Sequence, residues 1–197
     1  MMVVILARSR EPRRVLRSFP MRDDEFDDCI EMARALLGGY EGAGDLWEAN
    51  EYVNRALRAR PNEPEAWILK SQILSSLDDD PAAMAAADMA VRRAPRSAEG
   101  HYVRAAVLAD LERYHEALKA VERAFRHMRQ DDDWLLEDLY YEKAAILDAL
   151  DRADEAMATF EIGLKRCPES SLLKSGLEPL RRERVRRMFK VIPGGRN

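Results

Sequence analysis

The chain has few of the residues that define disulfide-rich, collagen-like or low-complexity proteins. Its 197 residues include two cysteines, Cys29 and Cys167, which cannot form a disulfide framework and which favour a reducing compartment, the cytoplasm. Glycine and proline number nine each, so collagen-like and low-complexity classes are excluded. The longest apolar run near the N-terminus, residues 1–7, is far shorter than the roughly 18 residues that span a bilayer. No basic residue precedes this run, as one would in a signal peptide.

Motifs for catalysis and metal binding are also missing. The three histidines, His101, His115 and His127, have no cysteine at the spacing of a zinc site. The sequence has no glycine-rich phosphate loop, no Gly-x-Ser-x-Gly elbow and no His-Glu-x-x-His pattern. We therefore expect no cofactor, no metal and no enzymatic activity. His101 falls on a packing position of the repeat described below, and we expect it to lie in the core.

What the chain has in abundance is charge, which makes up 35% of its residues and is unevenly distributed. The net charge is −4, but residues 1–22 carry +5 and residues 181–197 carry +6, which leaves −15 on residues 23–180. Such an acidic body attracts basic segments, either those of a partner or its own.

A 34-residue repeat organises the acidic body. Pro61 and Pro95 lie 34 residues apart, and each follows an alanine by five residues. On this register the chain divides into four units, 30–63, 64–97, 98–131 and 137–170, with a five-residue insertion before the last. Small residues recur at two equivalent positions, Ala49, Ala83, Ala117 and Ala156 at one and Ala56, Ala90, Ala124 and Gly163 at the other. Two apolar helical stripes per unit predict paired helices that bury their faces by stacking on neighbouring units.

Local patterns add three expectations. Ser71 and Ala83 are both small, so the two helices of the second unit are expected to approach closely there. Asp80, directly before Pro81, predicts the cap of the second helix in that unit. The insertion is expected to extend the following helix backwards with aspartate caps, and Trp134 is expected to pack as an apolar plug.

The repeat resembles that of the tetratricopeptide repeat (TPR) family, whose period is 34 residues. The resemblance covers about three quarters of the chain and rests on Trp67, Ser71, Ala83, Ala90 and Pro95 in the second unit and on Tyr114-His115-Glu116-Ala117-Leu118 in the third. This chain departs from the family's pattern at one position of the repeat where leucine is usual, because three units have a cation there, Lys70, Arg104 and Lys143.

The resemblance implies an all-α fold, a right-handed α-solenoid of about four helix-turn-helix units over residues 23–170. A basic N-terminal extension, residues 1–22, would precede it, and a basic capping helix and tail, residues 171–197, would follow. The first helix of each unit would line a concave groove. The residues read into that groove are Glu31, Arg34, Glu65, Ile68, Gln72, Glu99, Tyr102, Asp110, Asp138, Tyr141 and Asp148.

The composition of this predicted groove suits a protein or peptide partner that is basic and apolar. Tyr102, Tyr141 and Ile68 would be anchors within an acidic fringe. The acidic row at the start of the first helices has an equally good explanation, because carboxylates there stabilise the helix dipole. The family's clamp for the C-terminal carboxylate of chaperone tails is missing, since only Arg34 keeps a suitable charge at the matching positions. The sequence thus predicts a non-enzymatic interaction adaptor that is not a chaperone-tail receptor.

The two ends leave alternatives open. The C-terminal helix is interpreted either as a cap with one apolar face or as a surface for nucleic acid or an anionic membrane. The basic residues that the second interpretation uses are Arg181, Arg182, Arg184, Arg186, Arg187 and Lys190. For the N-terminal extension, either translation starts at Met21 and residues 1–20 are not part of the protein, or residues 1–19 form an arm that occupies the chain's own acidic groove. The sequence identifies neither the partner nor the oligomeric state.

Overall fold

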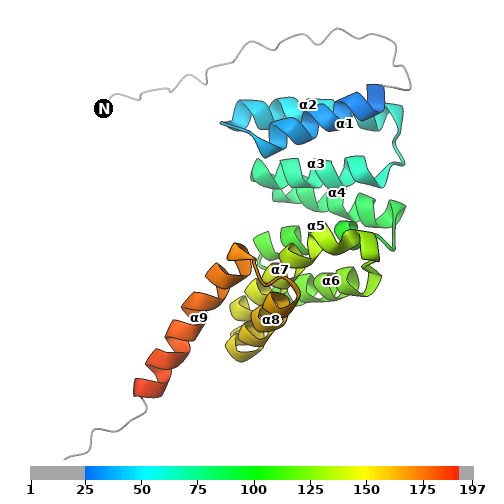
Figure 1. The fold of residues 1–197 in the computed structure, drawn as a ribbon. Coiled ribbons are helices and arrows are strands. Elements are labelled where there is room, and N and C mark those ends of the chain that lie inside the picture. The colour runs from blue at the N-terminus through cyan, green and yellow to red at the C-terminus, as the bar shows by residue number, and fades with distance from the viewer. Residues whose placement is uncertain (1–24, 191–197) are drawn as a thin grey trace, which may run out of the picture.

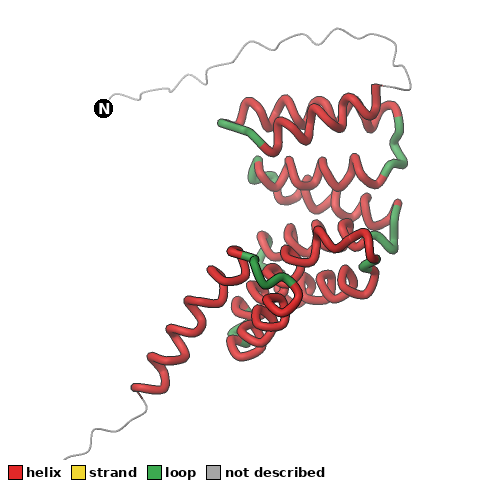
Figure 2. The backbone as a smooth tube through the Cα atoms, in the orientation of Figure 1, coloured by secondary structure: helices red, strands yellow, loops and turns green. Residues whose placement is uncertain are grey.

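The computed structural model describes residues 25–190, and every regular element in that range is a helix (Figures 1 and 2). The helices are α1 (Glu25–Gly38), α2 (Ala43–Ala59), α3 (Pro64–Ser76), α4 (Asp80–Arg93), α5 (Ala98–Asp110), α6 (Tyr114–His127), the 3-10 helix η1 (Gln130–Leu135), α7 (Leu136–Ala149), α8 (Ala153–Arg166) and α9 (Ser171–Lys190). The predicted N-terminal arm lies outside the described residues. Among the helices of residues 25–190, none is both long enough and apolar enough to cross a bilayer.

The helices form four pairs, α1 with α2, α3 with α4, α5 with α6 and α7 with α8, stacked in chain order (Figure 1). Each first helix also contacts the first helix of the next pair, whereas no comparable contact joins the second helices in this part of the chain. The first helices therefore lie on the more closely packed side of the stack. We call the surface formed by α1, α3, α5 and α7 the inner face. The predicted all-α solenoid of four helix pairs is confirmed.

The small residues predicted at helix contacts are buried. All seven alanines at the two repeat positions have no exposed surface, Ala49, Ala56, Ala83, Ala90, Ala117, Ala124 and Ala156. In the second unit the Ser71 hydroxyl donates a hydrogen bond to the carbonyl oxygen of Ala83 over 2.9 Å, so these helices meet where expected. Gly163 replaces the repeat's alanine because a Cβ there would lie 2.9 Å from both Cβ and Cγ of Tyr140.

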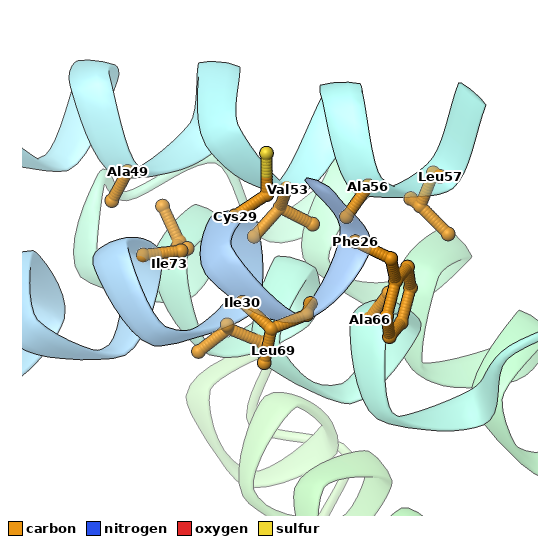
Figure 3. Close-up of a cluster of buried hydrophobic side chains, with 11 residues drawn as sticks. Phe26, Cys29, Ile30, Ala49, Val53, Ala56, Leu57, Ala66, Leu69 and Ile73 are labelled. Carbon is orange, nitrogen blue, oxygen red and sulfur yellow. The ribbon is translucent and has the colours of Figure 1, made fainter. Parts of the chain in front are cut away.

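The core is shared between neighbouring pairs. Figure 3 shows the cluster in which Phe26, Cys29 and Ile30 of α1 lie with residues of α2 and with Leu69 and Ile73 of α3. Further clusters join α5 with α6 and α7, and α7 with α8 and α9. No pair therefore buries its apolar faces alone, as expected for a repeat array.

The three cations that stand where the repeat usually has leucine contact the second helix of the preceding unit. The contacts are Lys70 Nζ to Asn54 Oδ1 at 2.8 Å, Arg104 Nε to Asp88 Oδ1 at 2.8 Å, and Lys143 Nζ at 5.8 Å from the centre of the Phe125 ring. Burial lowers the pKa of Lys70. Two of the departures from the repeat pattern thus make polar contacts between units, and the third makes a cation–π contact.

Three local predictions are corrected. Helix α4 begins at Asp80, but the capping carboxylate is that of Asp79, which accepts a hydrogen bond from the amide of Ala82. The insertion forms the separate 3-10 helix η1 instead of extending α7. Because a 3-10 helix turns by about 120° per residue, Leu135 is buried while its neighbour Trp134 is 61% exposed. Trp134 is therefore not a plug.

Only the first half of α9 packs on the repeats. Leu173 and Leu177 are buried against α7 and α8. Gly176 permits this contact, because a Cβ there would lie 2.6 Å from Cζ of Phe160. Residues 181–186 are all exposed, and Figure 1 shows the second half of α9 extending away from the stack. The first half thus covers the end of the last pair, while residues 181–186 are left exposed.

Candidate functional site

The structure places the predicted groove residues on the first helices with very different exposures. Four are exposed, Glu31, Arg34, Asp110 and Asp148. Six are partly buried, Glu65, Gln72, Glu99, Tyr102, Asp138 and Tyr141. Their role in binding stays a prediction, but their surroundings decide which of them a ligand could reach.

Ile68 does not belong to this surface. Its side chain is 5% exposed and packs against Ala87, Ala90 and Val103. We therefore correct the expectation that Ile68 is an exposed anchor, because the contact between α3, α4 and α5 covers it.

The two tyrosines are also more enclosed than expected. Tyr102 packs against two core clusters, and burial raises the pKa of its hydroxyl, with the charges of Asp138 and Glu142 adding to the effect. Tyr141 meets the ring of Phe160 edge-on, with ring centres 5.9 Å apart. Each tyrosine therefore supports the fold and presents only part of its ring at the surface.

Two carboxylates of the inner face, Glu65 of α3 and Glu99 of α5, lie near Arg34 of α1. Arg34 forms an ion pair with Glu65 over 2.6 Å. Burial raises the pKa of Glu99, against the opposing charge of Arg34. An open hollow of about 470 Å³ adjoins Glu99, and its wall includes Arg96, Arg129, Asp131 and Asp132.

A second group of carboxylates joins α5 and α7. Burial raises the pKa of Glu142 to about 7, and the charges of Asp110 and Asp138 contribute. Burial, together with Glu137, raises the pKa of Asp138. Glu142 was not among the predicted groove residues, and its raised pKa depends partly on Asp110, which comes from another unit. In spite of these carboxylates, no three or more His, Cys, Asp or Glu side chains within residues 25–190 are grouped so as to hold a metal ion.

Positive charge is nearly absent from the inner face. The first helices α1, α3, α5 and α7 carry four Lys or Arg residues in total. Three of these, Lys70, Arg104 and Lys143, contact the preceding second helix. Of these four, Arg34 is the one that lies beside the carboxylates. Arg96 and Arg129, from the connections between helix pairs, border the hollow next to Glu99. The carboxylates of the first helices outnumber these cations, and their field attracts positive charge.

The predicted basic tail residues lie on the projecting half of α9. Arg181 donates to Glu161 of α8 over 3.1 Å, and Arg182 lies 3.8 Å from Glu178 of its own helix. Arg184 and Arg186 are exposed, and no ion pair is found for either among the described residues. Arg187 and Lys190 belong to the helix, but their side chains lie outside the described part.

Two stacked histidines lie between α5 and α6. The prediction that His101 is a core residue is confirmed, and its ring centre lies 5.4 Å from that of His127. Nε2 of His101 lies 3.0 Å from the carbonyl oxygen of Pro95, which can only accept, so Nε2 carries the hydrogen. Nδ1 is then left buried without a partner. Burial lowers the pKa of His101, and the charges of His127, Arg123 and Arg104 lower it further, against the Pro95 bond.

We expect His101 to make the fold sensitive to acid. Below pH 6.5 the unfolded chain binds a proton at His101 that the folded chain resists, so the free energy of unfolding falls as the pH is lowered. We expect His101→Gln, which can still donate to Pro95, to lose less of this free energy between pH 7.5 and pH 5 than the parent. Urea titrations at both pH values measure the loss, with the exposed His115→Gln as control. An equal loss in the parent and in His101→Gln would contradict the assignment.

Comparison with known proteins identifies the fold. No family model matches the sequence, and no curated protein matches it. Solved structures do match. MamA from Desulfovibrio magneticus RS-1 is 19% identical, with a TM-score of 0.63 over 82% of this chain and 86% of that one. TTC0263, a thermophilic TPR protein in Thermus thermophilus, is 18% identical, with a TM-score of 0.61 over 79% of this chain and 90% of that one.

A third structure, YrrB, is described as a TPR protein with an unusual peptide-binding site. It is 21% identical, with a TM-score of 0.54 over 64% of this chain and 62% of its own. These likenesses agree with the 34-residue period, the buried alanines and the stacked helix pairs. The chain therefore has the tetratricopeptide-repeat fold.

Proposed function

We propose that the protein is a non-enzymatic interaction scaffold that holds a basic, apolar segment of a partner protein on its inner face. The observation that carries the proposal is the distribution of charge on the first helices. Carboxylates from three pairs gather on the inner face, while three of the four cations contact the second helices. The description of YrrB as peptide-binding supports the class of ligand.

The chemistry of capture follows from the surroundings of Glu142. A lysine or arginine of the partner would interact with Glu142 and Asp138, whose carboxyl groups otherwise keep their protons to higher pH. The partly exposed edges of Tyr102 and Tyr141 would contact apolar side chains on the same segment.

The two cysteines, Cys29 and Cys167, are free thiols, which supports a cytoplasmic location.

Binding of a basic probe is expected to strengthen as the pH rises. Glu142 loses its proton near pH 7, and only the ionised carboxylate attracts a cation, so affinity should increase between pH 6 and pH 8. Higher salt should weaken the same binding. Calorimetry with a synthetic amphipathic peptide of lysine and leucine measures both effects, and a peptide of glutamate and leucine should not bind.

Variants test which carboxylates are responsible. We expect Asp138→Asn/Glu142→Gln to lower affinity for the lysine and leucine peptide at least about tenfold and to flatten its pH dependence. The matched control is Glu48→Gln/Glu51→Gln, two exposed positions on α2. At Tyr102 the suitable substitution is Tyr102→Phe, because phenylalanine keeps the buried ring, whereas alanine would leave a cavity. Equal binding by the parent, the double variant and the control would contradict the proposal.

A second candidate function rests on the exposed half of α9. Residues 181–186 are all exposed and include four arginines, as a contact with nucleic acid or an anionic membrane would need. Binding to RNA, DNA or anionic vesicles that disappears in Arg184→Glu/Arg186→Glu would support it.

A further inference from the structure

The projecting half of α9 has the chemistry that the inner face is proposed to select. Residues 181–190 carry a net charge of +5. The same ten residues include three apolar positions, Val185, Met188 and Phe189. Val185 is 49% exposed, so the described part of this segment offers an apolar side chain beside its arginines.

The helix cannot deliver this segment to the inner face of its own molecule. Leu173 and Leu177 fix the first half of α9 on α7 and α8, and Arg181 holds the helix to Glu161 just before it leaves the body. The remaining residues continue the same helix for roughly 15 Å, directed away from the repeats (Figure 1). A second molecule is therefore the nearest source of a complementary acidic surface.

We propose that the second half of α9 docks on the inner face of a second copy of this chain. The inference rests on the proposed function and names its partner. Arg184 and Arg186 on one copy would face carboxylates such as Asp110 and Asp148, which are exposed at the C-terminal ends of α5 and α7 of the other. The two surfaces differ, so the contact is head-to-tail, and a pair of copies keeps one free α9 and one free inner face.

Charge reversal tests the contact from both sides. Asp110→Lys/Asp148→Lys reverses the charge at the two proposed docking positions, which lie at helix C-termini, where a cation also suits the helix dipole and folding should be preserved. Arg184→Glu/Arg186→Glu reverses the exposed helix. We expect the parent to self-associate in sedimentation velocity at about 100 µM protein and low salt, and to dissociate at about 0.5 M salt. Each double variant alone should be monomeric.

Recombining the variants gives the sharper result. A mixture of the two double variants should associate again, because the basic α9 of Asp110→Lys/Asp148→Lys meets an unchanged acidic inner face and the acidic α9 of Arg184→Glu/Arg186→Glu meets a basic one. A chain with all four substitutions should self-associate again. A parent that is monomeric at low salt, or an Arg184→Glu/Arg186→Glu variant that associates as well as the parent, would overturn the inference. A monomeric parent that binds anionic vesicles or RNA through these arginines would overturn it in favour of those ligands.

The same variants separate this inference from the proposed function. Arg184→Glu/Arg186→Glu keeps the inner face intact and should bind the lysine and leucine peptide as the parent does, or more tightly when a competing helix is removed. Peptide binding without self-association would reject only the second copy as partner. Absence of peptide binding by this variant would reject the proposed function as well.

Discussion

Replacing Leu108 by alanine is expected to lower the free energy of unfolding by about 2–5 kcal/mol. Leu108 has no exposed surface and lies in the cluster that joins α5, α6 and α7. The deletion leaves a cavity that neighbouring helices, held by their own contacts, fill only partly. Because each pair is stable only with its neighbours, the loss at the central pair should weaken the whole array. Urea unfolding followed by circular dichroism measures the change.

A surface position provides the control for this substitution. Ile162 in α8 is 49% exposed, and its replacement by alanine should change the free energy of unfolding by less than about 0.5 kcal/mol. Equal effects at Leu108 and Ile162 would mean that the α5 to α7 cluster does not stabilise the fold.

The second large effect is expected from Gly163→Ala. An added Cβ would lie 2.9 Å from Cβ and Cγ of Tyr140 and 3.0 Å from Leu173. The Cβ of Tyr140 is attached to the backbone of α7 and cannot rotate away, so α8 must shift from α7. Such overpacking costs about 1–3 kcal/mol, while alanine regains up to about 1 kcal/mol of helix propensity. We expect a net loss of stability, measured by thermal unfolding.

Gly44→Ala is the matched control. Gly44 is also helical, and no atom lies within 4 Å of an added Cβ. Only the propensity gain remains there, so this variant should be as stable as the parent or more stable. Opposite signs at two helical glycines would identify the contact with Tyr140 as the cause. A Gly163→Ala variant as stable as Gly44→Ala would contradict the close packing of α7 and α8.

Much of the fold could be predicted from the sequence because its strongest signals are local and repeated. Alanine at the same offset in successive units marks a place where only a small side chain fits between two helices, and Ala49, Ala83 and Ala117 are buried accordingly. The insertion lies outside the repeat, so no equivalent residues in the other units indicate its structure. Whether residues 130–135 continue α7 or form a 3-10 helix depends on how Leu135 reaches the core, which periodicity alone does not determine.

The candidate site could be predicted only in outline. The offsets correctly placed acidic residues on the first helices, but exposure depends on neighbouring units. Ile68 is covered by α4 and α5, and Tyr102 is largely enclosed. Glu142 owes its raised pKa partly to Asp110, which lies 32 positions earlier in the sequence. Burial and pKa shifts of this kind arise from contacts between units, and the order of residues along the chain does not show which residues of different units meet.

The cations at the leucine offset have a consequence for the order in which the units assemble. Leucine at every interface would make the interfaces interchangeable, and a folding chain could stack its second unit where the third belongs. Here each interface has its own pairing, Lys70 with Asn54, Arg104 with Asp88 and Lys143 with Phe125. Stacking α5 on α2 would leave Asp88 without its arginine and set that arginine against an amide. The residues that depart from the repeat thus distinguish the native sequence of units from its permutations.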